Sequence, residues 1–425
     1  MTEAEFVIAT RKGQGRALLA ARNGEHRLNF HAMRRLMLRW PALDSWFESY
    51  RGWFTVELLR TTLFEEELTQ LVIAHLKRIK GRSLDRRHKE AVVLELAKRG
   101  SAPAREAIYN GFNPASDFRF ADEIIELDGL AGLDWLITHS AEYLVTDNAR
   151  RFHMWIEDLS EVCSKEGISE WLALESTTRP EVARFAKLAA SAKARPKPSA
   201  GAPPKMISYQ ELRRGHSPSI SVRSTVLRWV SDAGDEGYRE AWLALAIEED
   251  PEWLRALALR VRGMPKYCDI DRIIELAGKW KAERNPFALA LENVVDPRVR
   301  RLGFDLIAEG WVMDGVNTVV ASGRAEDAPD ILAAVQELTG AEEIHSACLD
   351  LLRLADRFDA RDALLWVYEA TPCSECREFA VRKLIEKGPA SKQLLSECLL
   401  DCVAETREMA ATALAGITNP PGTED

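Results

Sequence analysis

The sequence lacks any apolar run long enough to cross a membrane. Its longest uncharged apolar stretches fall well short of the roughly 18 to 20 residues that a transmembrane helix needs. The first residues, MTEAEF, are acidic, whereas a secretory signal peptide begins with basic residues before an apolar block. We therefore expect a cytoplasmic protein with no membrane partner. Its 425 residues, 46% hydrophobic and 29% charged, are enough to fold into one or more globular cores.

Recognised catalytic motifs are also missing. The chain contains no Walker A loop, no GxGxxG and no HExxH, and none of its eight histidines stands beside a serine or cysteine in a nucleophile motif. Glu65 to Glu67 and Glu248 to Asp250 are most simply solvated faces or helix ends. The sequence therefore predicts no cofactor and favours a protein without enzymatic activity.

Cysteine is scarce, and its number, seven, is odd, so a disulfide framework is not expected. Four cysteines have spacings that zinc sites use, namely Cys373-x2-Cys376 and Cys398-x3-Cys402. The second pair lies among leucines at helical spacing, where buried cysteine behaves as a small hydrophobic residue. A redox role for the first pair would need a preceding strand, which is missing. We expect no metal, with these four residues as the zinc candidates.

Charge of one sign dominates each part of the chain. Residues 1–100 hold 19 Lys+Arg against 12 Asp+Glu, whereas residues 101–425 hold 38 against 54. The net charges are therefore +7 and −16. A polyanion would be attracted to the first part and repelled by the second, which argues against a protein that follows nucleic acid along its whole length.

Helical periodicity is present almost everywhere, whereas the two-residue alternation of a half-buried strand is hard to find. Apolar residues recur at three- and four-residue intervals in Phe64 to Ile79, His88 to Arg99, Arg150 to Cys163, Ile344 to Leu354 and Glu375 to Lys387. Pairs of an N-cap residue and proline predict helix starts at Asp250-Pro251, Asn285-Pro286 and Asp296-Pro297. Glycines predict helix ends at Gly100, Gly263, Gly310 and Gly388. The fold class is therefore all-α, built from short helices.

One segment interrupts the helical pattern. Residues Ser191 to Lys205 contain four prolines and no large apolar side chain, which is typical of a linker. Ser208 and Glu211 then have the spacing of a capping box, so a new helix should begin there. We predict a helical N-terminal lobe over 1–190, a linker over 191–206 and a helical-repeat domain over 207–420.

An internal repeat marks the second half of the chain. It consists of arginine, any residue, a large apolar residue, a small residue and an apolar residue, and the starts are 45, 45, 32 and 30 residues apart. The small residue would let a neighbouring helix approach closely while its apolar neighbours become buried. The copies begin at Arg255, Arg300, His345 (a degenerate copy), Arg377 and Arg407. Spacings of this length equal one helix pair with a variable loop.

These repeats resemble the HEAT-repeat family, most clearly in DPRVRRLGFDLIAEG and AETREMAATALAG. The resemblance covers residues 207–417, and residues 1–190 share only the rhythm of helix pairs. It implies an α-solenoid of HEAT-like helix pairs, in two lobes. An irregular helical bundle is the alternative.

A basic cluster lies in the first part of the chain, with Asp85 as its sole acidic residue. It comprises Lys77, Arg78, Lys80, Arg82, Arg86, Arg87 and Lys89. Such a cluster could bind phosphate or an acidic protein surface, or it could simply be a helix end whose cations complement the helix dipole. No aromatic residue alternates with these charges, so a stacking platform for single strands is absent.

Three functions are compatible with these features. The first is a non-enzymatic scaffold that presents a helical surface to another protein, with some of the twelve tryptophans on a binding face and the rest in the core. The second is nucleic-acid binding or DNA-base repair, which some HEAT-like proteins perform. The pairs Trp40 with Asp44 and Trp155 with Asp158 are its candidates. The third is assistance in cofactor attachment, as in HEAT-like bilin lyases, for which no residue stands out. We favour the first.

Overall fold

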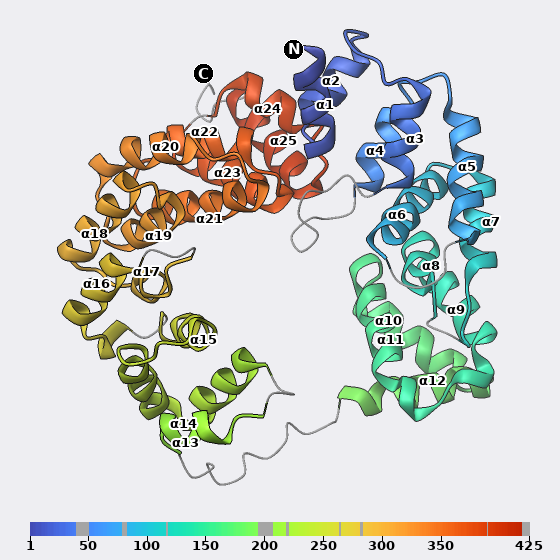
Figure 1. Cartoon of the computed structure of the whole chain (residues 1–425). Helices are drawn as coiled ribbons and strands as arrows, with labels where there is room; N and C mark the ends of the chain where they lie inside the picture. The colour runs from blue at the N-terminus through green and yellow to red at the C-terminus, as the bar shows by residue number, and fades with distance from the viewer. Residues whose placement is uncertain are drawn as a thin grey trace, which may run out of the picture. The chain divides into compact units, whose positions relative to one another are not determined.

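The structure is a computed structural model of the chain (Figure 1). It describes residues 1–39, 51–78, 83–115, 118–193, 207–217, 221–262, 265–280, 284–388 and 390–418. These residues form 25 α-helices and four short 3-10 turns, and their sole β-type pairing is an isolated bridge between Asn113 and Arg119. The all-α prediction is therefore confirmed for the described part of the chain.

The chain divides into two compact units. Unit 1 contains the described residues between 1 and 193 together with Leu395–Ala411, and unit 2 contains those between 207 and Leu394 together with 412–418. The predicted linker, 191–206, lies outside the described residues from position 194 onward.

Twelve α-helices form the first half of the chain. They are α1 (Glu3–Lys12), α2 (Gly15–Arg22), α3 (Phe30–Leu38), α4 (Gly52–Leu59), α5 (Glu65–Arg78), α6 (Leu84–Lys98), α7 (Ala102–Gly111), α8 (Ala121–Asp128), α9 (Leu130–His139), α10 (Ala149–Val162), α11 (Lys165–Glu175) and α12 (Pro180–Lys193). Two 3-10 turns, Ala141–Tyr143 and Thr146–Asn148, precede α10.

Thirteen α-helices form the second half. They are α13 (Tyr209–Gly215), α14 (Val222–Leu245, with non-helical backbone at Gly234), α15 (Pro251–Val261), α16 (Ile270–Lys279), α17 (Pro286–Leu291), α18 (Pro297–Ala308), α19 (Val312–Ser322), α20 (Ala328–Gln336), α21 (Ala341–Arg357), α22 (Arg361–Ala370), α23 (Ser374–Glu386), α24 (Lys392–Cys398) and α25 (Ala404–Thr418). The remaining 3-10 turns are Pro265–Tyr267 and Ala325–Asp327.

The predicted helix starts are confirmed. Asp250, Asn285 and Asp296 are the N-caps of α15, α17 and α18, and each side chain accepts hydrogen bonds from backbone N–H groups of the first turn. Ser208 and Glu211 form the predicted capping box of α13. Of the predicted helix ends, Gly100, Gly310 and Gly388 follow helices with positive φ, and Gly263 lies outside the described residues.

Helices of unit 1 pack as neighbours in two series. In the first, α2, α4, α6, α8, α10 and α12 pack each against the next, and in the second α3, α5 and α7 do so. Residues 395–411, from α24 and α25, complete this unit beside α1, because the Cys402 N–H donates to the Gly13 carbonyl at 3.0 Å. From the sequence, these residues were predicted to belong to the helical-repeat domain, 207–420.

Unit 2 also has two series of neighbouring helices. α15, α17, α19, α21 and α23 pack in succession, while α16, α18, α20 and α22 are their partners in the other series. α18 and α19 approach each other closely, because a Cβ on Gly303 would lie 2.8 Å from the Gly315 carbonyl oxygen. The predicted role of the repeat's small residue, to allow close helix packing, is met at this position.

The repeat copies do not occupy equivalent helices. Arg255, His345 and Arg377 lie in the series of α15, α21 and α23, whereas Arg300 lies on α18 in the other series. The small residue of the motif is buried in these copies, but the expected burial of its apolar neighbours is not met throughout, because Phe379 is 47% and Leu349 is 44% exposed. A buried small residue is a pattern that any closely packed amphipathic helix can share.

Candidate binding surfaces

A groove crosses four successive helices of one series in unit 2. Its volume is about 890 Å³, and its walls come from α17, α19, α21 and α23 together with Arg262 and Glu292, which follow α15 and α17. The lining residues are Arg262, Leu289, Glu292, Asn317, Ser346, Leu349, Asp350, Leu352, Arg353, Asp356, Phe379, Arg382, Lys383 and Glu386. No sequence pattern that we used identified this surface as a whole.

Two large apolar side chains in this groove remain open to solvent. Leu349 on α21 is 44% exposed and Phe379 on α23 is 47% exposed. The Arg382 guanidinium lies 5.6 Å from the centroid of the Phe379 ring, a cation–π distance. Exposed aromatic and aliphatic side chains within a concave surface are typical anchors for a protein partner.

Ion pairs hold the charged residues around these anchors. Glu292 accepts hydrogen bonds from Arg353 and, at 3.1 Å, from Arg262, while Lys383 lies 2.6 Å from the Asp356 carboxylate. The groove thus contains charges of both signs that are already paired with each other. A strongly charged ligand gains little from such a surface, whereas a polypeptide with apolar side chains and backbone amides fits it.

Asp350 is the most deeply buried acid of the groove lining, at 3% exposed. Burial raises the pKa of its carboxyl to about 7, while Arg353 at 3.4 Å acts in the opposite direction and the negative charge of Glu292 adds to the increase. Asp350 therefore changes its protonation near neutral pH, unlike a solvated aspartate.

A second, basic pocket lies in unit 1 between α3, α5 and the start of α6. It has a volume of about 440 Å³ and is lined by His31, Arg34, Arg35, Leu38, Arg39, His75 and Asp85. His31, Arg34, Arg35 and Leu38 of this list recur at three- and four-residue spacing, so they share one side of α3, and Arg39 follows as its C-cap. Three guanidinium groups facing one acid make a site for an anion.

Packing against α6 fixes the position of α3. The ring of buried His88 on α6 lies with Nε2 2.7 Å from the Leu36 carbonyl oxygen, as expected when the ring N–H donates to it. Burial lowers the pKa of His88 to about 4, so this ring is neutral at pH 7. At the pocket, burial and the charges of Lys89, Arg34 and Arg78 lower the pKa of His75, which indicates a positive local potential.

Only part of the basic cluster predicted from the sequence lies on the surface of the protein. Lys77, Arg78 and Arg87 are exposed, but Arg86 is 8% exposed and pairs with Glu90 at 2.8 Å, and Lys89 is 4% exposed and donates to the Asp85 carbonyl. Lys80 and Arg82 lie outside the described residues. The basic pocket instead uses Arg34 and Arg35 of α3 and its C-cap Arg39, which do not form a continuous run of charge in the sequence.

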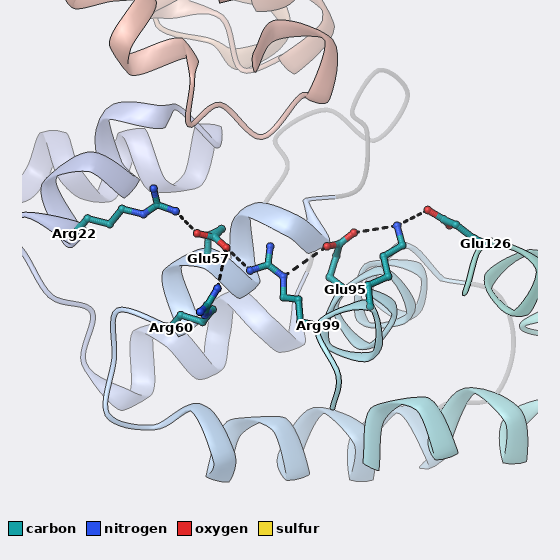
Figure 2. A network of polar contacts seen from close by, with 7 residues as sticks. Arg22, Glu57, Arg60, Glu95, Arg99 and Glu126 are labelled. Atoms are coloured by element: carbon teal, nitrogen blue, oxygen red, sulfur yellow. Dashed lines mark hydrogen bonds and ion pairs between the residues drawn. The ribbon is translucent and has the colours of Figure 1, made fainter. Parts of the chain in front are cut away.

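A network of ion pairs connects successive helices of unit 1, as Figure 2 shows. Glu57 on α4 accepts hydrogen bonds from Arg22 of α2 and Arg99 of α6, and Arg60 lies 3.7 Å away. The chain of contacts continues from Arg99 to Glu95, then through Lys98, which lies 3.3 Å from Glu95, to Glu126 of α8. Burial alone would raise the pKa of Glu57, but hydrogen bonds from Arg99 and Arg22 lower it. We interpret this network as one that stabilises the packing of these helices.

The four cysteines proposed for zinc fall in different units, Cys373 and Cys376 in unit 2 and Cys398 and Cys402 in unit 1. Within unit 2 the structure brings Cys373 and Cys376 to His345 of α21. In the sequence, His345 is a degenerate repeat position, and its spacing to the next cysteine, His345-x2-Cys348, is the one local signal of a metal ligand.

None of the tryptophans in the described residues is exposed. Trp155 is 1% exposed and packs against Phe118, Phe152 and Phe185, so it is part of the core and does not form a base-binding pair with Asp158. Trp40 and Asp44 lie outside the described residues. None of the described tryptophans lines the groove, where Phe379 and Leu349 are the exposed apolar residues.

Comparisons with known proteins do not place the chain in a family. No family model and no curated protein sequence matches the chain. A crystal structure of an engineered protein is 14% identical, with coverage of 99% of this chain and 100% of that chain, but its TM-score of 0.30 supports no argument. In the part of the chain that the structure describes, no helix is both long and apolar enough to span a membrane.

Proposed function

We propose that this protein is a non-enzymatic interaction scaffold, an α-solenoid of HEAT-like helix pairs whose groove in unit 2 binds a polypeptide segment of another protein. The observation that supports it best is the groove itself, with Leu349 and Phe379 exposed between side chains already fixed by ion pairs. Successive helices of one series form its floor, which is how helical-repeat proteins present binding surfaces. Preformed walls reduce the entropy lost on binding.

The charge of the groove indicates the chemistry of the segment. Arg262 and Arg353 pair with Glu292, and Lys383 pairs with Asp356, so recognition depends mainly on apolar contact and on hydrogen bonds. The segment should insert one bulky apolar side chain between Leu349 and Phe379. The backbone amides of the same segment would then form hydrogen bonds with polar side chains at the edge of the groove.

Affinity capture with the intact protein tests this proposal through two variants. Phe379→Asp places a charge at the centre of the groove and should remove the specifically captured protein. Leu365→Asp, at an exposed leucine of α22 that does not line the groove, is the matched control and should retain it. Equal capture by both variants would contradict the assignment of the groove.

A second function, binding of nucleic-acid phosphates, is favoured by one observation, the basic pocket of unit 1. Arg34, Arg35 and Arg39 line it, and guanidinium groups bind phosphate in bidentate fashion. The net charge of −9 and the lack of an aromatic residue in the pocket lining both weigh against it. We therefore retain it as the alternative to the scaffold.

A further inference from the structure

Four potential metal ligands of unit 2 come from only two helices. α21 carries His345 and, one turn later, Cys348, while Cys373 is the N-cap of α23 and Cys376 lies in its first turn. The ligand atoms of His345, Cys373 and Cys376 all lie within 4.8 Å of one another. All four residues are buried, at 5%, 0%, 0% and 3% exposed for His345, Cys348, Cys373 and Cys376.

We propose that His345, Cys373 and Cys376 hold a structural zinc ion, with Cys348 as the fourth ligand. Zinc in structural sites is tetrahedral with cysteine and histidine ligands. Zn–S bonds of about 2.3 Å and Zn–N bonds of about 2.0 Å place the ligand atoms roughly 3.5 to 3.8 Å apart. The ligand atoms of His345, Cys373 and Cys376 would have to draw together by up to roughly 1 Å around the ion, and the Cys348 sulfur, which is not within the 4.8 Å limit that these three share, would have to move toward them. From the sequence we expected no metal, and this proposal departs from that expectation.

The start of α23 supplies the outer contacts that such a site needs. The Cys376 N–H donates to the Cys373 sulfur at 3.4 Å, and the Cys373 N–H donates to the buried Thr371 hydroxyl at 3.1 Å. Hydrogen bonds of this kind orient the ligands and stabilise thiolates. The helix N-terminus adds a positive partial charge beside them.

Because zinc binds cysteine as the thiolate, each coordinated thiol would release its proton to solvent.

A catalytic redox pair is the main competing explanation for Cys373-x2-Cys376. Thiols that exchange disulfides must meet another protein, so they are partly exposed. Cys373 and Cys376 are 0% and 3% exposed, and they lie at the start of a helix in an all-helical unit. The burial that prevents exchange is typical of a structural zinc site, which is closed to solvent.

Elemental analysis of the full-length protein, purified without chelator, tests the proposal directly. We expect about one zinc per chain for the unchanged protein. Cys376→Ser, His345→Ala and Cys348→Ser should each lose most of this zinc. Cys268→Ser, at a cysteine of unit 2 outside the cluster, and Cys398→Ser, at a sequence-based candidate, should retain it. Zinc far below one per chain in the unchanged protein, or its retention in Cys376→Ser, would overturn the assignment.

A second measurement needs no variant that could fail to fold. Replacement of the bound ion by Co²⁺ in the unchanged protein should give the intense visible bands of a tetrahedral ion and a thiolate-to-cobalt absorption in the near ultraviolet. A strong chelator should then lower the melting temperature, because metal bound only in the folded state stabilises it. An intact mass two hydrogens lower, with no bound metal, would show a disulfide and would contradict the proposal.

Discussion

The backbone N–H of Cys402 donates to the carbonyl of Gly13 at 3.0 Å, so residues near the C-terminus belong to the same compact unit as α1 and α2. This pairing is possible because the backbones approach closely. A Cβ on Gly15, the first residue of α2, would overlap the Glu397 carbonyl oxygen. The helical periodicity of the two segments gives no sign that they are partners.

Gly15→Ala should therefore destabilise the protein by about 3 kcal/mol, because the clash is with backbone that cannot rotate away. Urea unfolding followed by circular dichroism measures the change. Gly278→Ala in α16 is the matched control, since an added Cβ there meets nothing within 4 Å and should be neutral or stabilising. A loss of less than about 0.5 kcal/mol in Gly15→Ala would show that the C-terminal segment does not pack there.

Replacing Glu57 should make unit 1 less stable in a pH-dependent way. The folded-state pKa of Glu57 lies below its ordinary value, so its charged form stabilises the protein above that value, about 4.5, and the contribution is lost as the pH falls through the folded pKa. At pH 7 we expect Glu57→Gln to cost about 1 to 2 kcal/mol, because charge-assisted hydrogen bonds to Arg22 and Arg99 become neutral. The difference from the unchanged protein should shrink in acid.

Glu126→Gln is the control for this network. Its side chain is 47% exposed and contacts Lys98 at the edge, so the same change of charge should cost no more than about 0.5 kcal/mol. Urea midpoints at pH 7 and at about pH 3, well below the ordinary pKa of a glutamate, compare the two variants. Equal losses at pH 7, or a constant loss for Glu57→Gln at both pH values, would contradict the account.

Replacing Asp350 should have the opposite effect on stability from replacing Glu57. Because burial raises its folded pKa to about 7, ionisation of this carboxyl reduces stability as the pH rises from about 4 to about 7. Asp350→Asn removes the titration, so the variant should gain stability relative to the unchanged protein over this interval, by about 2 kcal/mol at pH 8. Asp330→Asn, on the exposed surface of α20, should show no such gain. A variant that is less stable than the unchanged protein at pH 8 would refute the prediction.

A DNA-binding test of the basic pocket distinguishes the scaffold function from the nucleic-acid function. At low salt a DNA duplex should bind weakly, and replacing Arg34, Arg35 and Arg39 with glutamine should flatten the slope of log affinity against log salt by up to about three units. A triple change at exposed Lys77, Arg78 and Arg87 removes the same charge outside the pocket and should have a smaller effect. We expect no specific binding near 0.15 M salt. Binding retained there and abolished only by the pocket variant would replace the scaffold with the nucleic-acid function.

Local features of this chain could be predicted from its sequence, whereas contacts between distant segments could not. The caps at Asp250, Asn285 and Asp296 depend on neighbouring residues, and the structure confirms them. The arginines of α3 line a pocket because this helix packs against α5 and α6, where His88 contacts the Leu36 carbonyl. His345 meets Cys373 across 28 positions of sequence, and periodicity contains no information on such pairs.

Site-specific photo-cross-linking tests the central claim, that the groove of unit 2 binds a segment of another protein. A photoreactive phenylalanine analogue at Phe379, in the full-length protein produced in its source cell, should yield a covalent adduct with one region of one protein, identified by mass spectrometry. The same analogue at Leu243, which is 59% exposed on α14 and outside the groove, should not form this adduct. Absence of any protein adduct at position 379, or identical adducts at both positions, would contradict the claim.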